Sequence, residues 1–394
     1  MTDLLSGIRV LDLTNVLAGP YCAYQLALLG ADVIKVEAPS GGDLARQLGA
    51  SAELNAAGMG ASFLAQNAGK RSVVLDLKKE DDKQRFLDLV ATADALIENF
   101  RPGVMARLGL GFDELKKVRP SLVYCAISGF GQTGPMRNNP AYDQIIQGLS
   151  GIMSITGTPE TAPLRVGYPV ADTLGGLVGA FAIASALVRQ KTTGEGAFLD
   201  VSMLECTLSA LGWPVSNYLT AGIEPQAMGN ENMTAAPSGT FRTGEGLLNI
   251  AANKQEQFVT LCGLIDRPEL ARDDRFAERE TRKRNRMELK DLIEEALARD
   301  TAAAWEERFN RAGVPAGRVL TIPQALAEPQ IAGRHMAVRF NETAELGRPL
   351  TVVRGGFLVD GEPPLPRRSP PALGQHTREV LASLPARSKA EAGS

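Results

Sequence analysis

The first 130 residues repeat a strand–helix–strand pattern, and this repeat restricts the possible folds more than any other feature of the sequence. An apolar run at residues 8–13 is followed by a turn at 17–20, a helical segment at 21–29 and a second apolar run at 33–36. Further strands are predicted at residues 72–77, 95–98 and 122–127, with helices at 81–92 and 104–108. A helical crossover between neighbouring strands makes them parallel, so the sequence predicts a doubly wound α/β domain with a parallel sheet.

The segments after this repeat differ in composition. Residues 128–172 are rich in Gly, Pro and Asn, and irregular segments of this length in compact domains usually form functional loops. Regular structure is then predicted as a helix at 173–189, a strand at 197–202 and a helix at 203–220. Beyond it come a hairpin turning at 244–246 and charged helices near 254–264, 286–298 and 301–312. This second part is expected to be a smaller α+β domain.

The net charge and the apolar segments of the sequence indicate whether the protein binds nucleic acid or a membrane. A net charge of −3 creates no basic field, so we expect no binding to nucleic acid, and any anionic ligand must be bound by local cations. Residues 1–7 lack the features of a signal peptide, and the apolar stretch 174–188 has 15 residues, whereas about 20 span a bilayer. Four cysteines lie far apart without C-x-x-C spacing, as reduced core thiols do. We expect a cytoplasmic protein with no membrane partner.

Several common enzyme classes lack their motifs in this sequence. The first turn and Glu37, about 20 residues further on, resemble a dinucleotide-binding fingerprint, but Gly19 stands alone where G-x-G-x-x-G is required. The two histidines, His335 and His376, neighbour no cysteine or acidic pair with ligand spacing, and no G-x-S-x-G motif occurs. These observations disfavour a dehydrogenase, a triad hydrolase and a zinc enzyme, and we expect no metal site.

Carboxylates of the Gly-rich segment remain as candidate catalytic groups, chiefly Asp143 and Asp172. Asp172 lies directly before the predicted helix, where the helix dipole and free N–H groups stabilise an anion. From these residues alone, Asp172 is either a helix N-cap or a reactive carboxylate. Glycines at 175, 176 and 179 weaken a helix. Another helix or a ligand must therefore approach the backbone there.

Ten short motifs follow one another along almost the whole chain. They are GIRVLDLT (7–14), AGPYC (18–22), LLGADVIKVE (28–37), GD (42–43), KRSVVLDLK (70–78), ENFRPG (98–103), RLG (107–109), GFGQTGP (129–135), VAD (170–172) and LGQH (373–376). Any one of these strings alone is a weak signal, but their number and order make the combination specific. Together they resemble the class III CoA-transferase family.

The resemblance implies a reaction and a set of site residues. In this family the aspartate at the position of Asp172 attacks the thioester of the donor, and the reaction proceeds through an aspartyl anhydride and an aspartyl-CoA thioester. Coenzyme A is then a substrate in thioester form, and no tightly bound cofactor is expected. The residues expected along CoA are Leu17, Ala18, Leu75, Lys78, Asn99, Phe100, Arg101, Arg107, Tyr142 and Asp143. The cations among them suit the CoA phosphates.

Departures from the family pattern narrow the expected reaction. Leu17 stands where the formyl-CoA transferase branch has Gln, Ala38 replaces an Arg, and residues 229–239 replace a tetraglycine loop. These differences disfavour formyl or oxalate transfer. The α-methylacyl-CoA racemase branch uses a His in a Gly-His-Asp motif, where this chain has Ala-Tyr-Asp at 141–143. Racemisation needs two bases, so the loss of this His disfavours it.

We therefore expect a CoA-transferase that moves CoA from an acyl-CoA donor to a free carboxylic acid. The donor could be succinyl-CoA or another dicarboxylic acyl-CoA, and Arg46 or Arg165 could bind its far carboxylate, because Arg offers a bidentate fork. An α-methylacyl-CoA racemase or epimerase and a non-catalytic CoA-binding protein are the alternatives.

The resemblance also implies an architecture that composition does not reveal. It predicts a large Rossmann-like domain with a parallel sheet, a smaller α+β domain, and an interlocked homodimer. The expected parts are a large CoA-binding domain at residues 1–200, a linker helix at 201–224, a small domain at 225–325 and a C-terminal segment at 326–394 that returns to the large domain.

Overall fold

The chain forms two compact units in a computed structural model that describes residues 3–341, 343 and 346–385. The large unit comprises the described residues of 3–152, 165–224 and 329–385, and the small unit comprises 153–164 and 225–328. The segment 153–164, which we had expected in the large domain, joins the small unit, where the Gly229 N–H donates to the Gly157 carbonyl at 2.7 Å. Residues 386–394 of the expected C-terminal segment lie outside the described residues.

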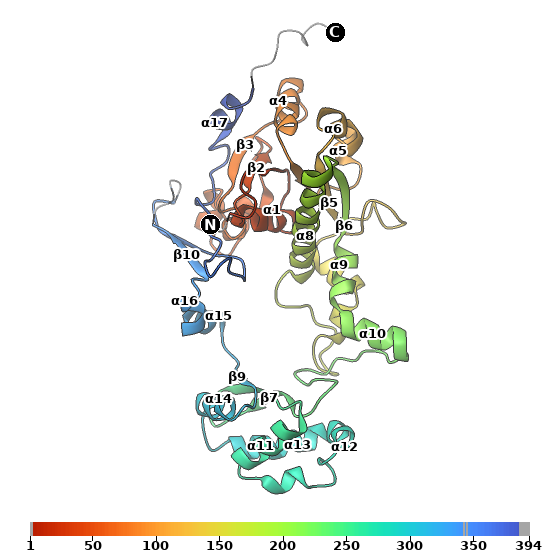
Figure 1. Cartoon of the computed structure of the whole chain (residues 1–394), viewed down its shortest axis with the longest axis vertical. Helices are drawn as coiled ribbons and strands as arrows, with labels where there is room; N and C mark the ends of the chain where they lie inside the picture. Colours follow the sequence, from red (N-terminus) through yellow and green to blue (C-terminus); the bar gives the residue numbers. More distant parts are fainter. Residues whose placement is uncertain (1–2, 342, 344–345, 386–394) are drawn as a thin grey trace. The chain divides into compact units, whose positions relative to one another are not determined.

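A six-stranded sheet with the order β3-β2-β1-β4-β5-β6 forms the centre of the large unit (Figure 1). Its strands are β1 (Arg9–Asp12), β2 (Asp32–Glu37), β3 (Arg71–Val74), β4 (Ala95–Glu98), β5 (Val123–Ser128) and β6 (Ala197–Ser202). Each pairing between neighbours is parallel, which confirms the predicted parallel sheet. The strand order reverses between β1 and β4, and sheets of this kind bind ligands outside the carboxyl ends of their strands at such a point.

Helices cover both faces of this sheet (Figure 1). One face packs mainly against α1 (Ala18–Leu28), α8 (Val170–Thr193) and α9 (Met203–Ala210). The other face packs against α4 (Glu80–Ala91), α5 (Val104–Arg107), α6 (Phe112–Val118) and α17 (Thr377–Ala382). Shorter or peripheral elements are η1 (Leu44–Gln47), α2 (Ala52–Ala56), α3 (Ala61–Leu64), α7 (Asp143–Leu149), η2 (Ile152–Ile155), α10 (Gly212–Ala221) and α16 (Pro329–Gly333).

The end of the chain packs onto the large unit. The Gly374 N–H donates to Ser72 Oγ at 2.8 Å, and the Val74 N–H donates to Thr377 Oγ1 at 3.0 Å. These bonds hold α17 beside β3, the edge strand of the sheet. A two-stranded antiparallel sheet of β10 (Ala337–Phe340) and β11 (Leu350–Val353) precedes this segment and accepts a hydrogen bond from the hydroxyl of Tyr24 on α1 at 2.7 Å.

The small unit has the expected α+β character. Its antiparallel sheet has the order β7 (Ser238–Arg242), β8 (Leu247–Ala251) and β9 (Ala316–Arg318). Its helices are α11 (Gln255–Leu264), η3 (Pro268–Ala271), α12 (Arg279–Arg284), α13 (Arg286–Leu297), α14 (Ala302–Arg311) and α15 (Ile322–Ala327). Trp305 and Phe309 stack with ring centroids 5.4 Å apart in a separate apolar core.

Helix α8 is longer than the sequence predicted, with 24 residues. It begins at Val170, so Asp172 lies in the first turn and is not the N-cap, a position that Pro169 occupies. By length and composition alone α8 could cross a membrane, but core helices of soluble proteins meet the same criteria, and half of its most apolar stretch is buried. The cytoplasmic location expected from the sequence stays a prediction.

The glycines of α8 allow other elements to approach its backbone. A Cβ atom added at Gly176 would overlap the carbonyl oxygen of Ala18 on α1, and one added at Gly175 would lie 2.9 Å from Met203 Cγ. A Cβ atom at Gly179 would lie 3.0 Å from Ile127 Cδ1. The expectation of a close neighbour is thus confirmed, and at Gly176 this neighbour is the first turn of α1.

A Gly176→Ala variant tests this contact. The new methyl group would push α1 away from α8, so we expect an unfolding free energy lower by about 1–3 kcal/mol in thermal or urea unfolding. Gly263→Ala in α11 is the matched control, because a Cβ atom there meets no heavy atom within 4 Å. That variant is expected to be neutral or more stable by up to ~1 kcal/mol. Equal stability of the two variants would contradict the contact.

Candidate active site

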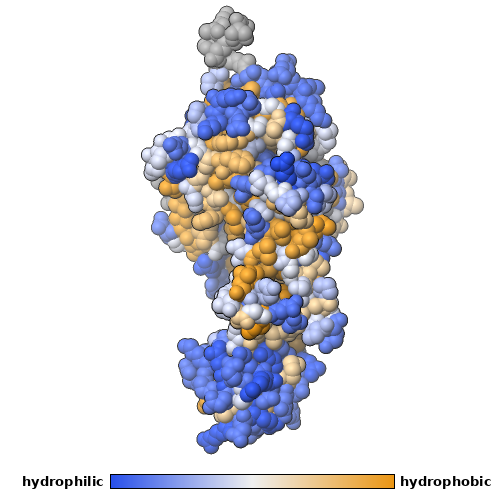
Figure 2. Space-filling model, turned by 90° about the vertical axis from the view of Figure 1, so that its right-hand side faces the viewer, coloured by the Kyte–Doolittle hydropathy of each residue, from blue (hydrophilic) through white to orange (hydrophobic). Residues whose placement is uncertain are grey.

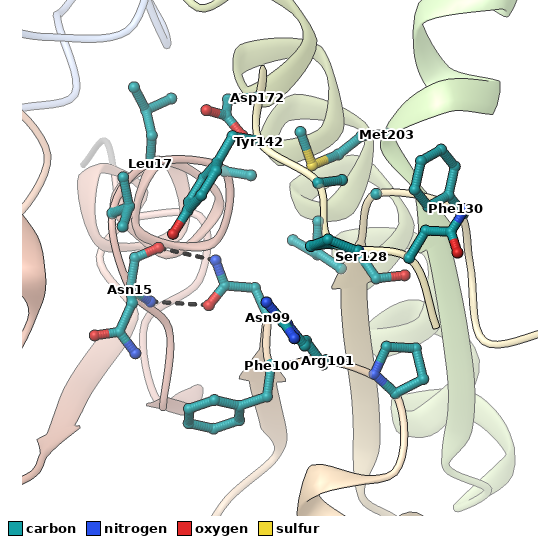
Figure 3. Close-up of a pocket in the computed structure, with 18 of the residues that line it drawn as sticks. Asn15, Leu17, Asn99, Phe100, Arg101, Ser128, Phe130, Tyr142, Asp172 and Met203 are labelled. Carbon is teal, nitrogen blue, oxygen red and sulfur yellow. Dashed lines mark hydrogen bonds between the residues drawn. The ribbon is translucent and has the colours of Figure 1, made fainter. Parts of the chain in front are cut away.

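A cavity of about 340 Å³ lies at the carboxyl ends of β1, β4 and β5 (Figure 3). Two turns that follow these strands are tied together in its wall. The Asn15 N–H donates to Asn99 Oδ1 at 2.9 Å, and Asn99 Nδ2 donates to the Asn15 carbonyl at 2.8 Å. The cavity is lined by Asn15, Val16, Leu17, Ala18, Leu44, Asn99, Phe100, Arg101, Pro102, Ile127, Ser128, Gly129, Phe130, Arg137, Asn139, Pro140, Ala141, Tyr142, Asp172 and Met203.

Asp172 is a carboxylate of this cavity, and Figure 3 shows it near Leu17, Tyr142 and Met203. Its backbone is fixed by Asp143 at the start of α7. Asp143 Oδ1 accepts hydrogen bonds from the N–H groups of Ala171 at 2.9 Å and of Asp172 at 3.4 Å. Asp143 therefore does the capping at the N-terminus of α8, which leaves the side chain of Asp172 directed into the cavity.

The position of Asp143 is itself determined by Gln147 one turn along α7. Gln147 Nε2 donates to Asp143 Oδ2 at 2.7 Å, and Gln147 Oε1 accepts from the Val166 N–H at 2.8 Å. Gln147 is fully buried and Asp143 is 7% exposed. The side chain of Asp143 is thus used inside the protein, and Asp143 does not line the cavity.

The surroundings of Asp172 make its carboxylate more basic than usual. Burial is the larger cause and the negative charge of Asp143 the second, and together they raise the pKa of Asp172 to about 7. Near neutral pH the carboxylate is therefore partly ionised, and its anion is a stronger nucleophile than an ordinary aspartate. A titratable group with a raised pKa in a cleft marks a functional site.

The first turn of α1 contributes to the same cavity. The N-cap residue Leu17 provides no side-chain hydrogen bond to the helix. The N–H groups of Leu17, Ala18 and Gly19 have no hydrogen-bond acceptor within the described part of the chain. A helix N-terminus carries a partial positive charge, so these groups can stabilise negative charge that develops near Asp172.

A second cavity of about 330 Å³ lies next to the first and shares Asn15 and Phe100 with it. Its walls combine apolar residues with the cations Lys78 and Arg107. The lining residues are Leu13, Thr14, Asn15, Val36, Glu37, Ala38, Gly42, Asp43, Leu75, Asp76, Leu77, Lys78, Phe100, Val104, Arg107 and Leu108. An elongated ligand with anionic groups at one end could occupy both cavities.

The two cavities bring together most residues that the sequence analysis singled out. The first is lined by Leu17, Ala18, Asn99, Phe100, Arg101, Tyr142 and Asp172, and the second by Leu75, Lys78, Phe100 and Arg107. Asp143 lines neither. Neither His335 nor His376 lines either cavity.

Four cavity cations form no ion pair with any residue that the structure describes: Lys78, Arg101, Arg107 and Arg137. Arg137 was missed by the sequence analysis, because a single Arg in a Gly-rich loop has no pattern that reveals its neighbours. A free cation beside a cavity is available to an anionic ligand.

The two arginines expected to bind a far carboxylate are placed differently. Arg46 is 1% exposed, and its Nε and Nη2 each donate to a different Glu37 oxygen at 2.7 Å. Its guanidinium also lies 3.8 Å from the ring centre of Phe63. The expectation that Arg46 binds the far carboxylate of a substrate is therefore wrong, because its guanidinium is buried and already forms a bidentate pair with Glu37. Arg165 lies 3.8 Å from Asp143 Oδ2 and lines neither cavity.

Comparison with known proteins identifies relatives over the whole chain. Residues 5–377 match the model of CoA-transferase family III. An acetyl-CoA:oxalate CoA-transferase of Acetobacter aceti is 42% identical over 88% of both chains. A succinate–glutarate CoA-transferase of Agrobacterium fabrum is 38% identical over 98% of both chains.

A solved structure supports the same relationship. The crystal structure of a CAIB/BAIF family protein from Brucella suis matches with a TM-score of 0.84 and 35% identity, over 98% of this chain and all of the other. The expectation of a CoA-transferase that exchanges CoA between an acyl-CoA and a carboxylate is thereby confirmed at the level of the class. The chain belongs to CoA-transferase family III.

Proposed function

We propose that this enzyme transfers CoA through covalent intermediates on Asp172. The observation that carries the proposal is a half-buried carboxylate with a pKa of about 7, in a cavity also lined by Leu17 and Ala18, whose N–H groups have no acceptor among the described residues. An ordinary aspartate is a weak nucleophile, and a raised pKa strengthens it. Among the described residues that line this cavity, none besides Asp172 is a base of the kind that a hydrolase would use to activate water.

The reaction has two halves: the donor first loads CoA onto Asp172, and the acceptor acid then removes it by the same steps in reverse. An oxygen of Asp172 attacks the donor thioester carbonyl, the C–S bond breaks and CoA leaves as a thiolate, so that a mixed anhydride of Asp172 and the donor acid remains. The thiolate then attacks the aspartyl carbonyl and releases the donor acid, which leaves an aspartyl-CoA thioester. The acceptor carboxylate attacks that thioester, which releases the CoA thiolate and forms a second anhydride, and the thiolate then attacks the acceptor acyl carbonyl of this anhydride. Acyl-CoA leaves and Asp172 is free again, so no net proton transfer is required.

The N-terminus of α1 is proposed to stabilise the tetrahedral intermediates. Each step places negative charge on a carbonyl oxygen next to Asp172, and the N–H groups of Leu17 and Ala18 have no other acceptor within the described residues. Preorganised donors of this kind contribute much of the rate enhancement in acyl transfer, about 2.7–4 kcal/mol for one donor. They also keep the ionised nucleophile in place.

The proposed path of CoA follows the two cavities. Lys78 and Arg107 suit the phosphate groups, and the apolar side chains of Leu75 and Val104 suit the adenine ring. The pantetheine arm then passes Asn15 and Phe100, which both cavities share, and brings the thioester to Asp172. This path supports the roles that the sequence resemblance implies for these residues.

A racemase needs a second base, and the described residues that line the cavity of Asp172 offer none. Tyr142 stands beside Asp172, and its phenol is a poor base near neutral pH. His376 accepts a hydrogen bond from the Ser72 N–H at 3.3 Å, on β3, and lines neither cavity. A carboxylate that attacks a carbonyl therefore fits the cavity better than a pair of bases that remove an α-proton.

We propose dicarboxylic acids as the exchanged substrates. The relatives from Acetobacter aceti and Agrobacterium fabrum are named for oxalate and for succinate and glutarate. Arg101 and Arg137 line the cavity of Asp172, and one of them can bind a far carboxylate once the other is used for CoA. Oxalate stays among the candidates despite Leu17. A panel of acids tests the choice, and faster turnover of monocarboxylic acids would contradict it.

We also propose a homodimer. Large apolar side chains are exposed on α8 and α10, namely Leu177, Phe181, Val188, Trp213 and Leu219 at 50–75%. Figure 2 shows apolar surface gathered over the large unit, whereas the small unit is mainly hydrophilic. A second copy that covers these side chains would remove them from water. Light scattering is expected to give twice the mass of the chain, and a monomer would contradict the proposal.

Asp172→Ala tests the nucleophile. We expect transfer to fall by at least about 10³-fold, because removing a covalent nucleophile costs far more than removing a contact. Asp113→Ala, which removes an exposed carboxylate in the first turn of α6, is the control and should retain activity. Circular dichroism verifies that both variants are folded. A folded Asp172→Ala enzyme with more than a few per cent of wild-type turnover would show that Asp172 is not the nucleophile.

Isotope exchange without an acceptor tests the covalent route. The enzyme is incubated with an acyl-CoA and the corresponding carbon-labelled acid in deuterated buffer, and the acyl-CoA is analysed by mass spectrometry. We expect the label to enter the acyl-CoA while the α-proton is retained, because the anhydride forms at the carbonyl. Deuterium uptake at the α-carbon faster than carbon exchange would instead indicate a racemase with Asp172 as its base.

The pH dependence tests the electrostatic role of Asp143. Asp172 reacts as the anion, so kcat/KM should rise through its pKa of about 7. Asp143→Asn removes a negative charge that raises this pKa, so the rising limb should move to lower pH. The pKa should stay above its ordinary value, because burial is the larger cause. If the pH at which kcat/KM rises is the same in a folded Asp143→Asn variant, Asp143 acts only by capping the N-terminus of α8.

A further inference from the structure

A network of buried charges lies beneath the turn that joins β1 to α1. It contains Asp12, Glu37, Asp43, Lys35, Arg46 and Lys70, each at most 4% exposed. The three acids and three bases form ion pairs of Lys70 Nζ with Asp12 Oδ2 at 2.8 Å, of Lys35 Nζ with Asp43 Oδ2 at 2.9 Å, and of Arg46 Nε with Glu37 Oε1 at 2.7 Å. Buried charges are costly unless paired, so the balance explains why they are tolerated, but not why they are present.

The network holds the two sides of the turn. Lys35 Nζ donates to the Thr14 carbonyl at 2.7 Å, and Lys70 Nζ donates to the Pro20 carbonyl at 2.9 Å. Between these two carbonyls lie the residues that carry the free N–H groups of the site. Two buried lysines therefore fix the chain immediately before and after the segment that faces Asp172.

Val16, in the middle of this turn, has an unfavourable backbone conformation. Its φ angle is +67°, in the left-handed region that a β-branched residue rarely adopts. The Val16 N–H donates to Asp43 Oδ1 at 2.9 Å, and the same oxygen accepts from the Ala45 N–H at 2.9 Å. The other oxygen, Oδ2, faces Lys35. Both oxygens of Asp43 are thus used inside the protein, and one of them bonds the strained residue directly.

We infer that Asp43 is a positioning residue for the transfer reaction. By accepting the Val16 N–H it keeps the turn in the left-handed conformation, and this conformation directs the N–H groups of Leu17 and Ala18 into the cavity of Asp172. Lys35 Nζ pairs with Asp43 Oδ2 at 2.9 Å and so keeps the carboxylate oriented. The inference rests on the proposed function, because it assigns to those N–H groups the stabilisation of the tetrahedral intermediates.

A pair of double variants separates the hydrogen bond from the charge. Lys35→Met/Asp43→Asn and Lys35→Met/Asp43→Ala both remove one acid and one base, so the remaining pairs Asp12–Lys70 and Glu37–Arg46 stay balanced. Only the Asn variant keeps an oxygen that can accept from Val16. We expect kcat of the Ala variant to be lower by on the order of tenfold or more, with little change in KM for the acyl-CoA, because the donors act in the transition state.

Substitutions at Val16 then test whether the effect acts through the backbone. In the Lys35→Met/Asp43→Ala enzyme, Val16→Gly should recover roughly tenfold in kcat, because Gly adopts a positive φ without strain. Val16→Ala is the matched control, since it also removes the branched side chain but keeps the strain, and it should recover little. Equal kcat values for the Gly and Ala variants, or for the Asn and Ala variants of Asp43, would overturn the inference.

Two further controls keep the outcomes distinct. If the Lys35→Met/Asp43→Ala enzyme does not fold, the single Asp43→Asn variant replaces it, because an amide oxygen is a weaker acceptor than a carboxylate. In that background kcat should be higher with Val16→Gly than with Val16→Ala, by less than tenfold. Equal kcat values of these two variants would again overturn the inference. If the wild-type enzyme shows no exchange of labelled acid into acyl-CoA, the proposed reaction is wrong. If it shows exchange but the variants do not differ, only the role of Asp43 is wrong.

Discussion

The contact of α1 with α8 at Gly176 is the constraint on which the site depends. Because Gly176 has no side chain, the carbonyl of Ala18 can lie against the backbone of α8. The two helices then present their N-terminal turns to one cavity, one with free N–H groups and the other with Asp172. Two positive helix ends at one place favour anions. In the proposed reaction the nucleophile, the leaving thiolate and the acceptor are all anions.

Cations of the large unit fall into two groups with different tasks. Lys35, Lys70 and Arg46 are buried and paired, and they hold the segments that form the cavity walls. Lys78, Arg101, Arg107 and Arg137 line the cavities without an acidic partner among the described residues. A chain with a net charge of −3 can therefore still offer local positive charge to an anionic ligand at these cavities.

Much of this arrangement could be predicted from the sequence, and the exceptions have physical reasons. Apolar runs such as 8–13 located the parallel strands, and the order of motifs pointed to Asp172. The N-cap alternative for Asp172 was wrong because α8 begins at Val170, and Asp143, 29 residues earlier, supplies the capping oxygen. Arg46 was misjudged because sequence spacing does not reveal that its Nε and Nη2 donate to Glu37 inside the protein. Such errors concern partners that only the tertiary fold brings together.

The closure of the sheet edge by the end of the chain has a consequence for how the protein forms during synthesis. Val74 on β3 and Thr377 are 303 positions apart, yet their hydrogen bond is part of the same unit as the site. During translation all six strands of the parallel sheet are synthesised long before residues 374–377 leave the ribosome. Until then β3 offers unpaired backbone groups, a known starting point for association between chains. Long-range closure of this kind also slows folding, so chaperone protection should matter most late in translation.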